Sequence, residues 1–218
     1  FFMSRRARVI IPGIAHHITQ RGNNRQDVFY EEKDFNNYCY WINEYAAFYQ
    51  VSILAYCLMR NHVHFIVVPK DKDGVSRLFS TVHMRYVQYV HKNRASSGHM
   101  WQGRFFSCVM DDRHLFFALR YVEQNPVRAG MVRYPWDYPW SSAKYHVGIS
   151  VQRYINVKES PIVDKHQWKE YLMNRDSDVD DQIRKKTFAG KAFADEDFVT
   201  RWEGKLNCLL RDLKRGRK

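Results

Sequence analysis

The sequence predicts an α+β protein with a ferredoxin-like antiparallel sheet, helices on one face of that sheet, and a mostly helical C-terminal extension. Over the first 148 residues, short runs rich in β-branched and aromatic residues alternate with segments whose apolar residues recur every three or four positions. The resulting element order is β-α-β-β-α-β-α. Without its last helix, this order is the split βαβ pattern of a ferredoxin-like sheet. The composition then becomes more polar after Gly148.

The first half of the pattern begins with a strand at residues 15–21, which a Gly-Asn-Asn turn ends. A helix is expected at residues 34–49, because large apolar side chains recur there at spacings of three and four. Strands are expected at residues 51–58 and 62–69. The second of these is short, apolar and closed by Pro69, which is typical of a buried strand.

The second half predicts a helix at residues 75–92, a fourth strand at residues 105–110 and a further helix at about residues 114–124. Asp111 and Asp112 precede the last helix. Carboxylates there can accept hydrogen bonds from the exposed N–H groups of its first turn. This helix is expected to end before an Asn-Pro pair.

We expect residues 3–148 to form one unit and residues 149–218 to form an extension. In the extension, Trp168 lies in a segment with helical spacing, residues 176–181 are acidic, and a helix is expected near residues 195–213. The chain ends in a basic run, which is either a solvated tail or a contact for a nucleic-acid backbone. The basic candidates in this tail are Lys214, Arg215 and Arg217.

The charge balance favours a polyanionic partner. There are 35 lysines and arginines against 23 aspartates and glutamates, so the formal net charge is +12. A nucleic acid is the simplest partner for such a chain. No apolar run reaches the ~18 residues of a membrane helix, no secretion signal is evident, and no phosphate loop or dinucleotide motif occurs. We therefore expect a cytoplasmic protein without a nucleotide cofactor. Its four cysteines contain no CxxC pair and are expected to be free thiols.

A pair of histidines on the third predicted strand is the sharpest chemical feature. His62 and His64 are two positions apart, so their side chains project from the same face of the strand. Two neutral imidazoles side by side form half of a divalent metal site. The alternative is two ordinary half-buried histidines.

A second feature lies on the last predicted core helix. Tyr121 and Asn125 are four positions apart and therefore share a helical face. If this face points at the sheet, a phenol and an amide oxygen could meet the two imidazoles. A tyrosine hydroxyl can act as a nucleophile when a metal polarises the group that it attacks. The alternative is a core tyrosine whose hydroxyl finds a hydrogen-bond partner.

Three motifs occur together and in a suitable order: HVH at residues 62–64, WQGRFFS at residues 101–107 and YVEQNPVRAG at residues 121–130. With these motifs, residues 5–148 resemble the single-tyrosine HUH transposases, and among them the REP-associated tyrosine transposases of bacteria. The opening segment with HHITQRGN at residues 16–23 also fits this family.

The resemblance implies roles for individual residues. Tyr121 would attack a phosphate of single-stranded DNA and form a 5′-phosphotyrosyl link. His62 and His64 would hold a divalent metal, either Mg²⁺ or Mn²⁺. Asn125 is the preferred third ligand, and Gln124 and Glu123 remain open as alternatives.

The resemblance also implies a partner, a single-stranded DNA hairpin with a flanking guide sequence, for a bacterial cytoplasmic, nucleoid-associated protein. A monomer is favoured over a dimer. The opposing hypotheses are a catalytically idle hairpin-binding regulator and a ferredoxin-like RNA-binding domain, although no matching aromatic RNA motif is present. The candidate DNA-binding residues are Arg5, Arg6, Arg8, Arg21, Trp101, Arg104, Phe105, Arg128, Lys214, Arg215 and Arg217. For the aromatic members of this set, core packing is the alternative to base stacking.

Overall fold

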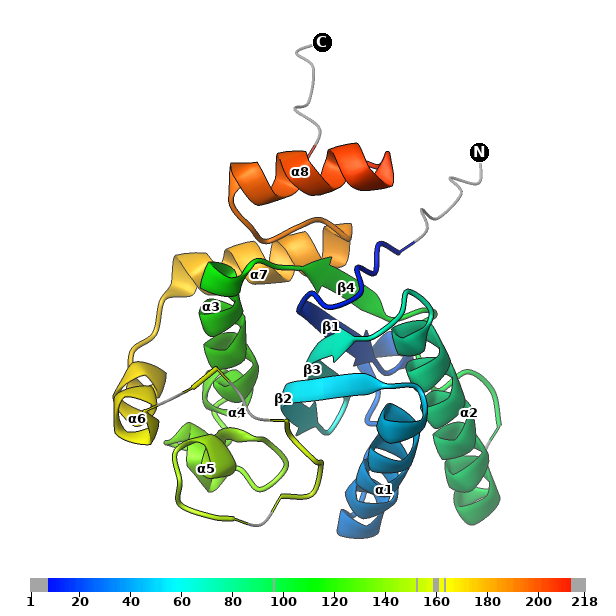
Figure 1. Ribbon diagram of the computed structural model, residues 1–218. Helices are drawn as coiled ribbons and strands as arrows, with labels where there is room; N and C mark the ends of the chain where they lie inside the picture. Colours follow the sequence, from blue (N-terminus) through cyan, green and yellow to red (C-terminus); the bar gives the residue numbers. More distant parts are fainter. Residues whose placement is uncertain (1–7, 96, 152, 159–160, 163, 213–218) are drawn as a thin grey trace.

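The computed structural model describes residues 8–95, 97–151, 153–158, 161–162 and 164–212. Its centre is a four-stranded antiparallel sheet in the order β2-β3-β1-β4 (Figure 1). The predicted α+β class and ferredoxin-like antiparallel sheet are confirmed. The strands are β1 (His16–Arg21), β2 (Val51–Met59), β3 (His62–Pro69) and β4 (Phe106–Val109).

The two crossover helices, α1 (Glu32–Phe48) and α2 (Gly74–Arg94), pack together on one face of the sheet, as expected. Two further helices, α3 (Asp112–Glu123) and α7 (Ser177–Ala189), contact the opposite face. Helices therefore cover both faces, whereas the sequence predicted them on one. The physical reason is that the second face also carries apolar side chains that must be buried. Its fully or almost fully buried side chains include Cys57, Ile66 and Cys108.

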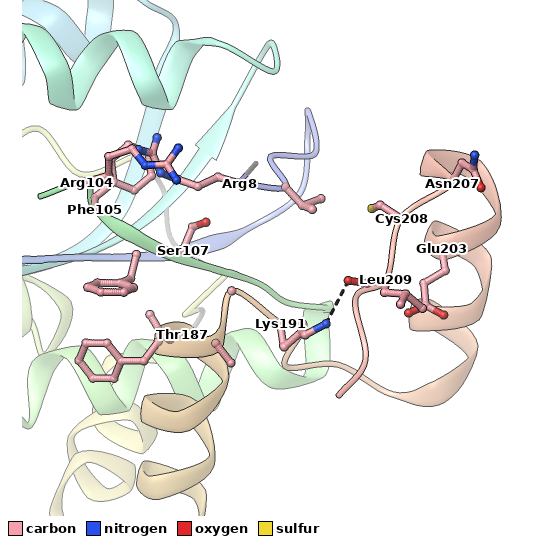
Figure 2. A pocket seen from close by; sticks show the side chains of 15 residues that line it. Arg8, Arg104, Phe105, Ser107, Thr187, Lys191, Glu203, Asn207, Cys208 and Leu209 are labelled. Carbon is pink, nitrogen blue, oxygen red and sulfur yellow. Dashed lines mark hydrogen bonds between the residues drawn. The ribbon is translucent and has the colours of Figure 1, made fainter. Parts of the chain in front are cut away.

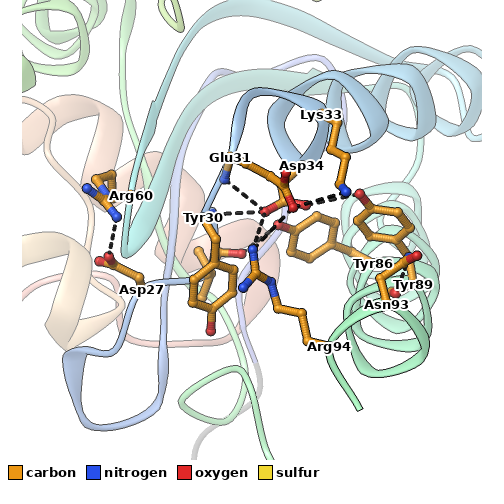
Figure 3. A network of polar contacts seen from close by, with 11 residues as sticks. Asp27, Tyr30, Glu31, Lys33, Asp34, Arg60, Tyr86, Tyr89, Asn93 and Arg94 are labelled. Carbon is orange, nitrogen blue, oxygen red and sulfur yellow. Dashed lines mark hydrogen bonds and ion pairs between the residues drawn. The ribbon is translucent and has the colours of Figure 1, made fainter. Parts of the chain in front are cut away.

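The N-terminus of α1 is tied to α2 by a polar network (Figure 3). Asp34 accepts hydrogen bonds from the backbone N–H groups of Tyr30 and Glu31 at 2.9 and 3.1 Å. The Tyr89 hydroxyl on α2 donates to the same carboxylate at 3.0 Å, and Arg94 lies 3.3 Å from Glu31. These bonds satisfy the backbone N–H groups of the N-cap residue and of the residue before it. They also fix the packing of the two helices that support the sheet from the face opposite the histidines.

The helix α3 starts at the predicted cap. The Asp111 side chain accepts a hydrogen bond from the backbone N–H of His114 at 2.8 Å. The helix ends at Glu123, and the short helix α4 (Asn125–Arg128) follows directly, with Pro126 in its first turn. Proline is tolerated there, because the first N–H groups of a helix have no intrahelical partner.

The segment after residue 130 is mostly helical and packs onto the same core. Its elements are η2 (Pro135–Asp137), α5 (Ala143–His146), α6 (Lys165–Met173), α7 and α8 (Glu196–Leu206). Buried side chains of the extension, among them Ile155, Trp168, Leu172 and Ile183, join the main hydrophobic cluster. The sequence predicted α6 and α8 but missed α7, because its charged residues conceal the buried face that Asp180, Ile183 and Thr187 form.

Segments from beyond residue 130 also cover both edges of the sheet. Along β2, the backbone N–H of Leu58 donates to the carbonyl of Trp140 at 2.9 Å, and the N–H of Ser142 donates to the carbonyl of Tyr56 at 3.0 Å. Along β4, the N–H of Phe193 donates to the carbonyl of Val109 at 2.9 Å. Covered edges cannot pair with strands of other chains. Among the helices of the described residues, none is long and apolar enough to cross a membrane.

Candidate active site

The structure brings Tyr121 onto the histidine face of the sheet. His62 and His64 project from β3, with ring centres 4.9 Å apart and ring planes at 85°. The Tyr121 ring, carried by α3, lies edge-on to His64 with ring centres 5.7 Å apart. The centre of the Tyr121 ring lies 5.5 Å from the centre of the His17 ring. His17 belongs to β1, the strand next to β3. Strand alternation and helical phase therefore place the predicted nucleophile beside the predicted metal ligands.

Burial keeps the imidazoles of this cluster neutral. It lowers the pKa of His62 to about 4 and that of His17 to about 3, and nearby arginines act in the same direction. The pKa of His64 is lowered well below its ordinary value for the same reason, with neighbouring His62 contributing. A neutral imidazole has a lone pair that a metal could use at neutral pH.

The contacts of the two predicted ligands fit a divalent metal. Nδ1 of His62 lies 2.6 Å from Oδ1 of Asn61, and Nδ1 of His64 lies 2.8 Å from Nε2 of His17. Metal-binding histidines usually engage one ring nitrogen with a second partner in this way and coordinate through the other. Within the described residues no hydrogen bond engages Nε2 of His62 or His64. No group of three or more His, Cys, Asp or Glu side chains suited to a metal occurs in this part of the chain. The sequence offered Asn125, Gln124 and Glu123 as candidates for a further ligand.

The three candidates for that further ligand point in different directions. The Asn125 amide donates to the carbonyls of Tyr121 and Val122 at 3.1 and 3.2 Å. This leaves its carbonyl oxygen as the atom that could bind a metal. The Gln124 amide donates to the carbonyl of Leu172 at 2.7 Å, toward α6.

Glu123 is fully buried and has its own partners on the far side of α3. Its carboxylate lies 2.5 Å from Nδ1 of His146 and accepts hydrogen bonds from the Ser142 hydroxyl at 2.5 Å and the Trp168 indole at 3.0 Å. Both carboxylate oxygens are thereby engaged. The buried amide oxygen of Gln124, in contrast, has no hydrogen-bond partner among the described residues, so Asn125 and Gln124 both keep an oxygen for a metal.

Arg128 contacts the candidate nucleophile directly. Its guanidinium lies 4.1 Å from the centre of the Tyr121 ring and 3.3 Å from the carboxylate of Asp180 on α7. Burial raises the pKa of Tyr121, and the positive charge of Arg128 opposes this increase. Predicted as a DNA-binding residue, Arg128 thus lies within the Tyr121 site.

A second basic group lies at the β4 edge. The Arg8 guanidinium is 3.8 Å from the centre of the Phe105 ring. Burial, with Arg104 nearby, lowers the pKa of Arg8 to about 10. These three residues line one end of a cavity of about 800 Å³ (Figure 2), whose other walls include Thr187 and Lys191. Arginines beside an aromatic ring are suited to unstacked bases and their phosphates.

The remaining DNA-binding candidates differ in environment. Trp101 is buried, and its ring stacks on His83 with centres 4.3 Å apart, which matches the core-packing alternative. Arg21 donates to the side-chain oxygen of Gln102 at 2.8 Å and lies at the exposed end of β1. Five predicted basic residues lie outside the described part of the chain: Arg5, Arg6, Lys214, Arg215 and Arg217.

Sequence reasoning missed three residues of this site: His17, Asp180 and Thr187. The His17 Nδ1 lies 2.8 Å from the Thr187 hydroxyl oxygen. A sequence signal existed only for His17, because it lies in the predicted strand at residues 15–21. In the sheet its ring stacks on that of His64, on the same face of β1 and β3. Asp180 and Thr187 lie far along the chain and are brought in by the packing of α7.

The chain is similar to known proteins in sequence and in fold. The family model described as "Transposase IS200 like" matches residues 11–125, which is more than half of the chain. A REP-associated tyrosine transposase of Haemophilus influenzae is 26% identical over 133 residues, covering 52% of this chain and 74% of that protein.

Solved structures also match. The structure of a REP-associated tyrosine transposase bound to a REP hairpin shares the fold, with a TM-score of 0.57 and 20% identity, covering 74% of this chain and 94% of the other. A transposase structure from Deinococcus radiodurans matches with a TM-score of 0.39 and 16% identity, covering 56% of this chain and 97% of the other. On the family match, which includes β1, both histidines of β3 and Tyr121, this chain belongs to the IS200-like transposase family.

Proposed function

We propose that this protein is a metal-dependent endonuclease and strand transferase for single-stranded DNA, acting near hairpins of repetitive elements through a 5′-phosphotyrosyl intermediate on Tyr121. One observation carries the proposal: the Tyr121 ring lies against His64, on the face from which His62 and His64 project. A hairpin substrate is supported by the solved relative with the same fold, which is bound to a REP hairpin.

In the proposed reaction, the Tyr121 hydroxyl oxygen attacks the phosphorus of a DNA phosphodiester in line with the bond to the 3′ oxygen. The new bond joins the tyrosine oxygen to phosphorus, the bond from phosphorus to the 3′ oxygen breaks, and the phenol proton leaves. The departing strand ends in a 3′-hydroxyl after proton uptake. A second 3′-hydroxyl reverses the step and joins strands, because the phosphotyrosyl bond conserves the phosphodiester linkage.

His62, His64 and Asn125 are the residues that would hold a divalent cation, Mg²⁺ or Mn²⁺. When bound, this cation supplies stabilisation of the negative charge that develops on the phosphate oxygens. Two imidazoles make the donor set soft for Mg²⁺, so Mn²⁺ is expected to bind at least as well.

Arg128 would favour the deprotonated form of the nucleophile. Its charge opposes the rise in the Tyr121 pKa that burial causes. Its guanidinium nitrogen donates to the Tyr121 carbonyl at 2.6 Å, which holds the cation beside the ring. Arg128 thus both positions and activates Tyr121 in this proposal.

Outside the reacting centre, Arg8 and Arg104 flank Phe105 at the β4 edge (Figure 2) and would bind the phosphates and bases of the strand beside the hairpin. Phosphate contacts of this kind position DNA and make binding dependent on salt.

The test is covalent capture of DNA. The protein is incubated with hairpin oligonucleotides taken from the DNA that flanks its own gene, with Mn²⁺, Mg²⁺ or chelator, and products are separated on a denaturing protein gel. We expect a metal-dependent protein–DNA band that Tyr121→Phe removes while hairpin affinity is retained. Tyr40→Phe is the control, because Tyr40 is exposed on α1.

A covalent band that persists in Tyr121→Phe would contradict the assignment of the nucleophile. Tight hairpin binding without any band in the unmodified protein would favour the alternative, a catalytically idle hairpin-binding regulator.

A further inference from the structure

A chain of hydrogen bonds runs from α7 to the metal-ligand candidate His64. The Thr187 hydroxyl donates to the carbonyl of Ile183, one turn earlier in α7, at 2.7 Å. Nδ1 of His17 lies 2.8 Å from the Thr187 oxygen, and Nε2 of His17 lies 2.8 Å from Nδ1 of His64. Thr187 and His17 are 1% exposed and His64 is 5% exposed, so water cannot substitute freely for these partners.

The proton positions in this chain follow from counting donors. A hydroxyl has one proton, and that of Thr187 is used by the Ile183 carbonyl. With its proton assigned to the Ile183 carbonyl, the Thr187 oxygen accepts, and the Nδ1–H of His17 is assigned as its donor. A neutral imidazole has one N–H, so Nε2 of His17 is an acceptor and takes the Nδ1–H of His64. Nε2 of His64 is thereby left with its lone pair.

We propose that Thr187 and His17 are positioning residues that fix the Nδ1–H tautomer of His64, so that its Nε2 is presented to the divalent cation. The inference rests on the proposed function for the identity of the cation site. It assigns a role in that site to the C-terminal extension, because Thr187 lies beyond the residues matched by the family model, 11–125. Second partners of metal-binding histidines commonly fix the tautomer and the ring orientation.

Replacing the threonine would allow the chain to reverse. Valine has nearly the same shape but no oxygen, so in Thr187→Val the Nδ1–H of His17 loses its acceptor. His17 can then place its proton on Nε2 and donate to Nδ1 of His64, which moves the His64 proton onto Nε2. That proton blocks the nitrogen that the cation needs. Serine keeps the hydroxyl and should preserve the original direction.

The experiment measures tautomer and metal affinity without DNA. In ¹⁵N-labelled, metal-free protein, long-range proton–nitrogen correlation spectra report which nitrogen of His64 carries the proton. Titration calorimetry with MnCl₂ gives the affinity. We expect the Nδ1–H tautomer in the unmodified protein and in Thr187→Ser, and a roughly 10–100-fold loss of Mn²⁺ affinity in Thr187→Val, the range for loss of a second partner. Lys185→Ala, on the exposed side of α7, is the matched control.

The possible failures are distinguishable. An Nε2–H tautomer of His64 in the unmodified protein would overturn the inference whatever the metal does. Unchanged Mn²⁺ affinity in Thr187→Val, with affinity lost in His64→Ala, would overturn it while leaving the metal site in place. Mn²⁺ affinity that is unaffected by His64→Ala would instead contradict the metal site of the proposed function. Thermal denaturation of each variant shows that α7 remains folded.

Discussion

The guanidinium of Arg128 lies over the face of the Tyr121 ring, 4.1 Å from its centre, and donates to the backbone carbonyl of the same tyrosine at 2.6 Å. The Arg128 side chain, which is 14% exposed, is thus held against the proposed nucleophile, a residue seven positions away in the same stretch of chain. Asp180 on α7 pairs with this cation at 3.3 Å, so a residue of the extension fixes its position. This relationship gives the first prediction.

Replacing Arg128 with Gln should shift the pH profile of adduct formation toward higher pH. The Arg128 charge lowers the pKa of Tyr121 against the effect of burial, so its removal raises that pKa. At a pH below the Tyr121 pKa, each unit of increase lowers the deprotonated fraction about tenfold. The measurement is the initial rate of covalent adduct formation between pH 6 and pH 10. Arg128→Lys retains the charge and should keep a profile close to that of the unmodified protein. In the double variant Arg128→Gln/Asp180→Asn the shift should be smaller than in Arg128→Gln, because the Asp180 charge raises the pKa of Tyr121. An unchanged profile would contradict this role.

Either His62→Ala or His64→Ala should abolish divalent metal binding and adduct formation while hairpin affinity is retained. Each variant removes an imidazole whose Nε2 is directed to the proposed cation site. The loss of Mn²⁺ affinity should exceed the roughly 10–100-fold that loss of a second partner costs. Calorimetric titration with MnCl₂ checks the first result and the denaturing gel checks the second. His83→Gln is the control, since His83 is a buried histidine on the opposite face of the sheet, beside Trp101.

Glu123→Gln should destabilise the protein without affecting the metal. The Glu123 carboxylate is fully buried among Ser142, His146 and Trp168, and an amide cannot satisfy all three partners. A mismatched buried group costs about 1–3 kcal/mol of unfolding free energy, which urea denaturation measures. Ser142→Ala should cause a smaller loss. If Glu123→Gln lost Mn²⁺ affinity while remaining folded, Glu123 would replace Asn125 as the third ligand candidate.

The protein should lose stability as the pH falls from about 6.5 toward 4. Burial lowers the pKa of His16 and His62 to about 4 and that of His17 and His83 to about 3. Below about pH 6.5 the unfolded chain therefore binds protons that the folded chain does not, and each such histidine reduces the unfolding free energy by up to about 1.4 kcal/mol per pH unit. Urea denaturation at pH 7.5, 6 and 5, with chelator present, measures this. His83→Gln should make the dependence shallower, and a stability that is flat over this range would refute the prediction.

Arg104→Gln should weaken hairpin binding in a salt-dependent way. If Arg104 contacts one phosphate of the single strand, its loss reduces the slope of log affinity against log salt by about 0.7. Fluorescence anisotropy of a labelled hairpin at several salt concentrations measures the slope. Lys33→Gln, at the start of α1 within the polar network of Figure 3, should leave it unchanged. An equal change in both variants would indicate a general effect of net charge.

The sequence by itself determined much of the fold. Periodicities of two and of three to four located four strands and the helices α1, α2 and α3 to within a few residues. These signals are local. Each element buries one face, and the apolar residues of that face recur along the sequence with the period of the helix or strand. The same locality made the HVH pair interpretable, since alternate residues of a strand must share a face. It also placed Tyr121 and Asn125 on one face of their helix.

Only the tertiary structure decided what surrounds those residues. The Thr187–His17–His64 chain joins α7, β1 and β3, and its geometry depends on strand register and helix packing. Trp101 is buried because its ring stacks on His83 of α2. Glu123 faces away from the histidines because its carboxylate accepts a hydrogen bond from Trp168 of α6. The charged residues of α7 concealed a helix whose buried side chains Asp180 and Thr187 contact Arg128 and His17. A local pattern fixes the direction of a side chain, whereas its partners depend on contacts between segments far apart in the chain.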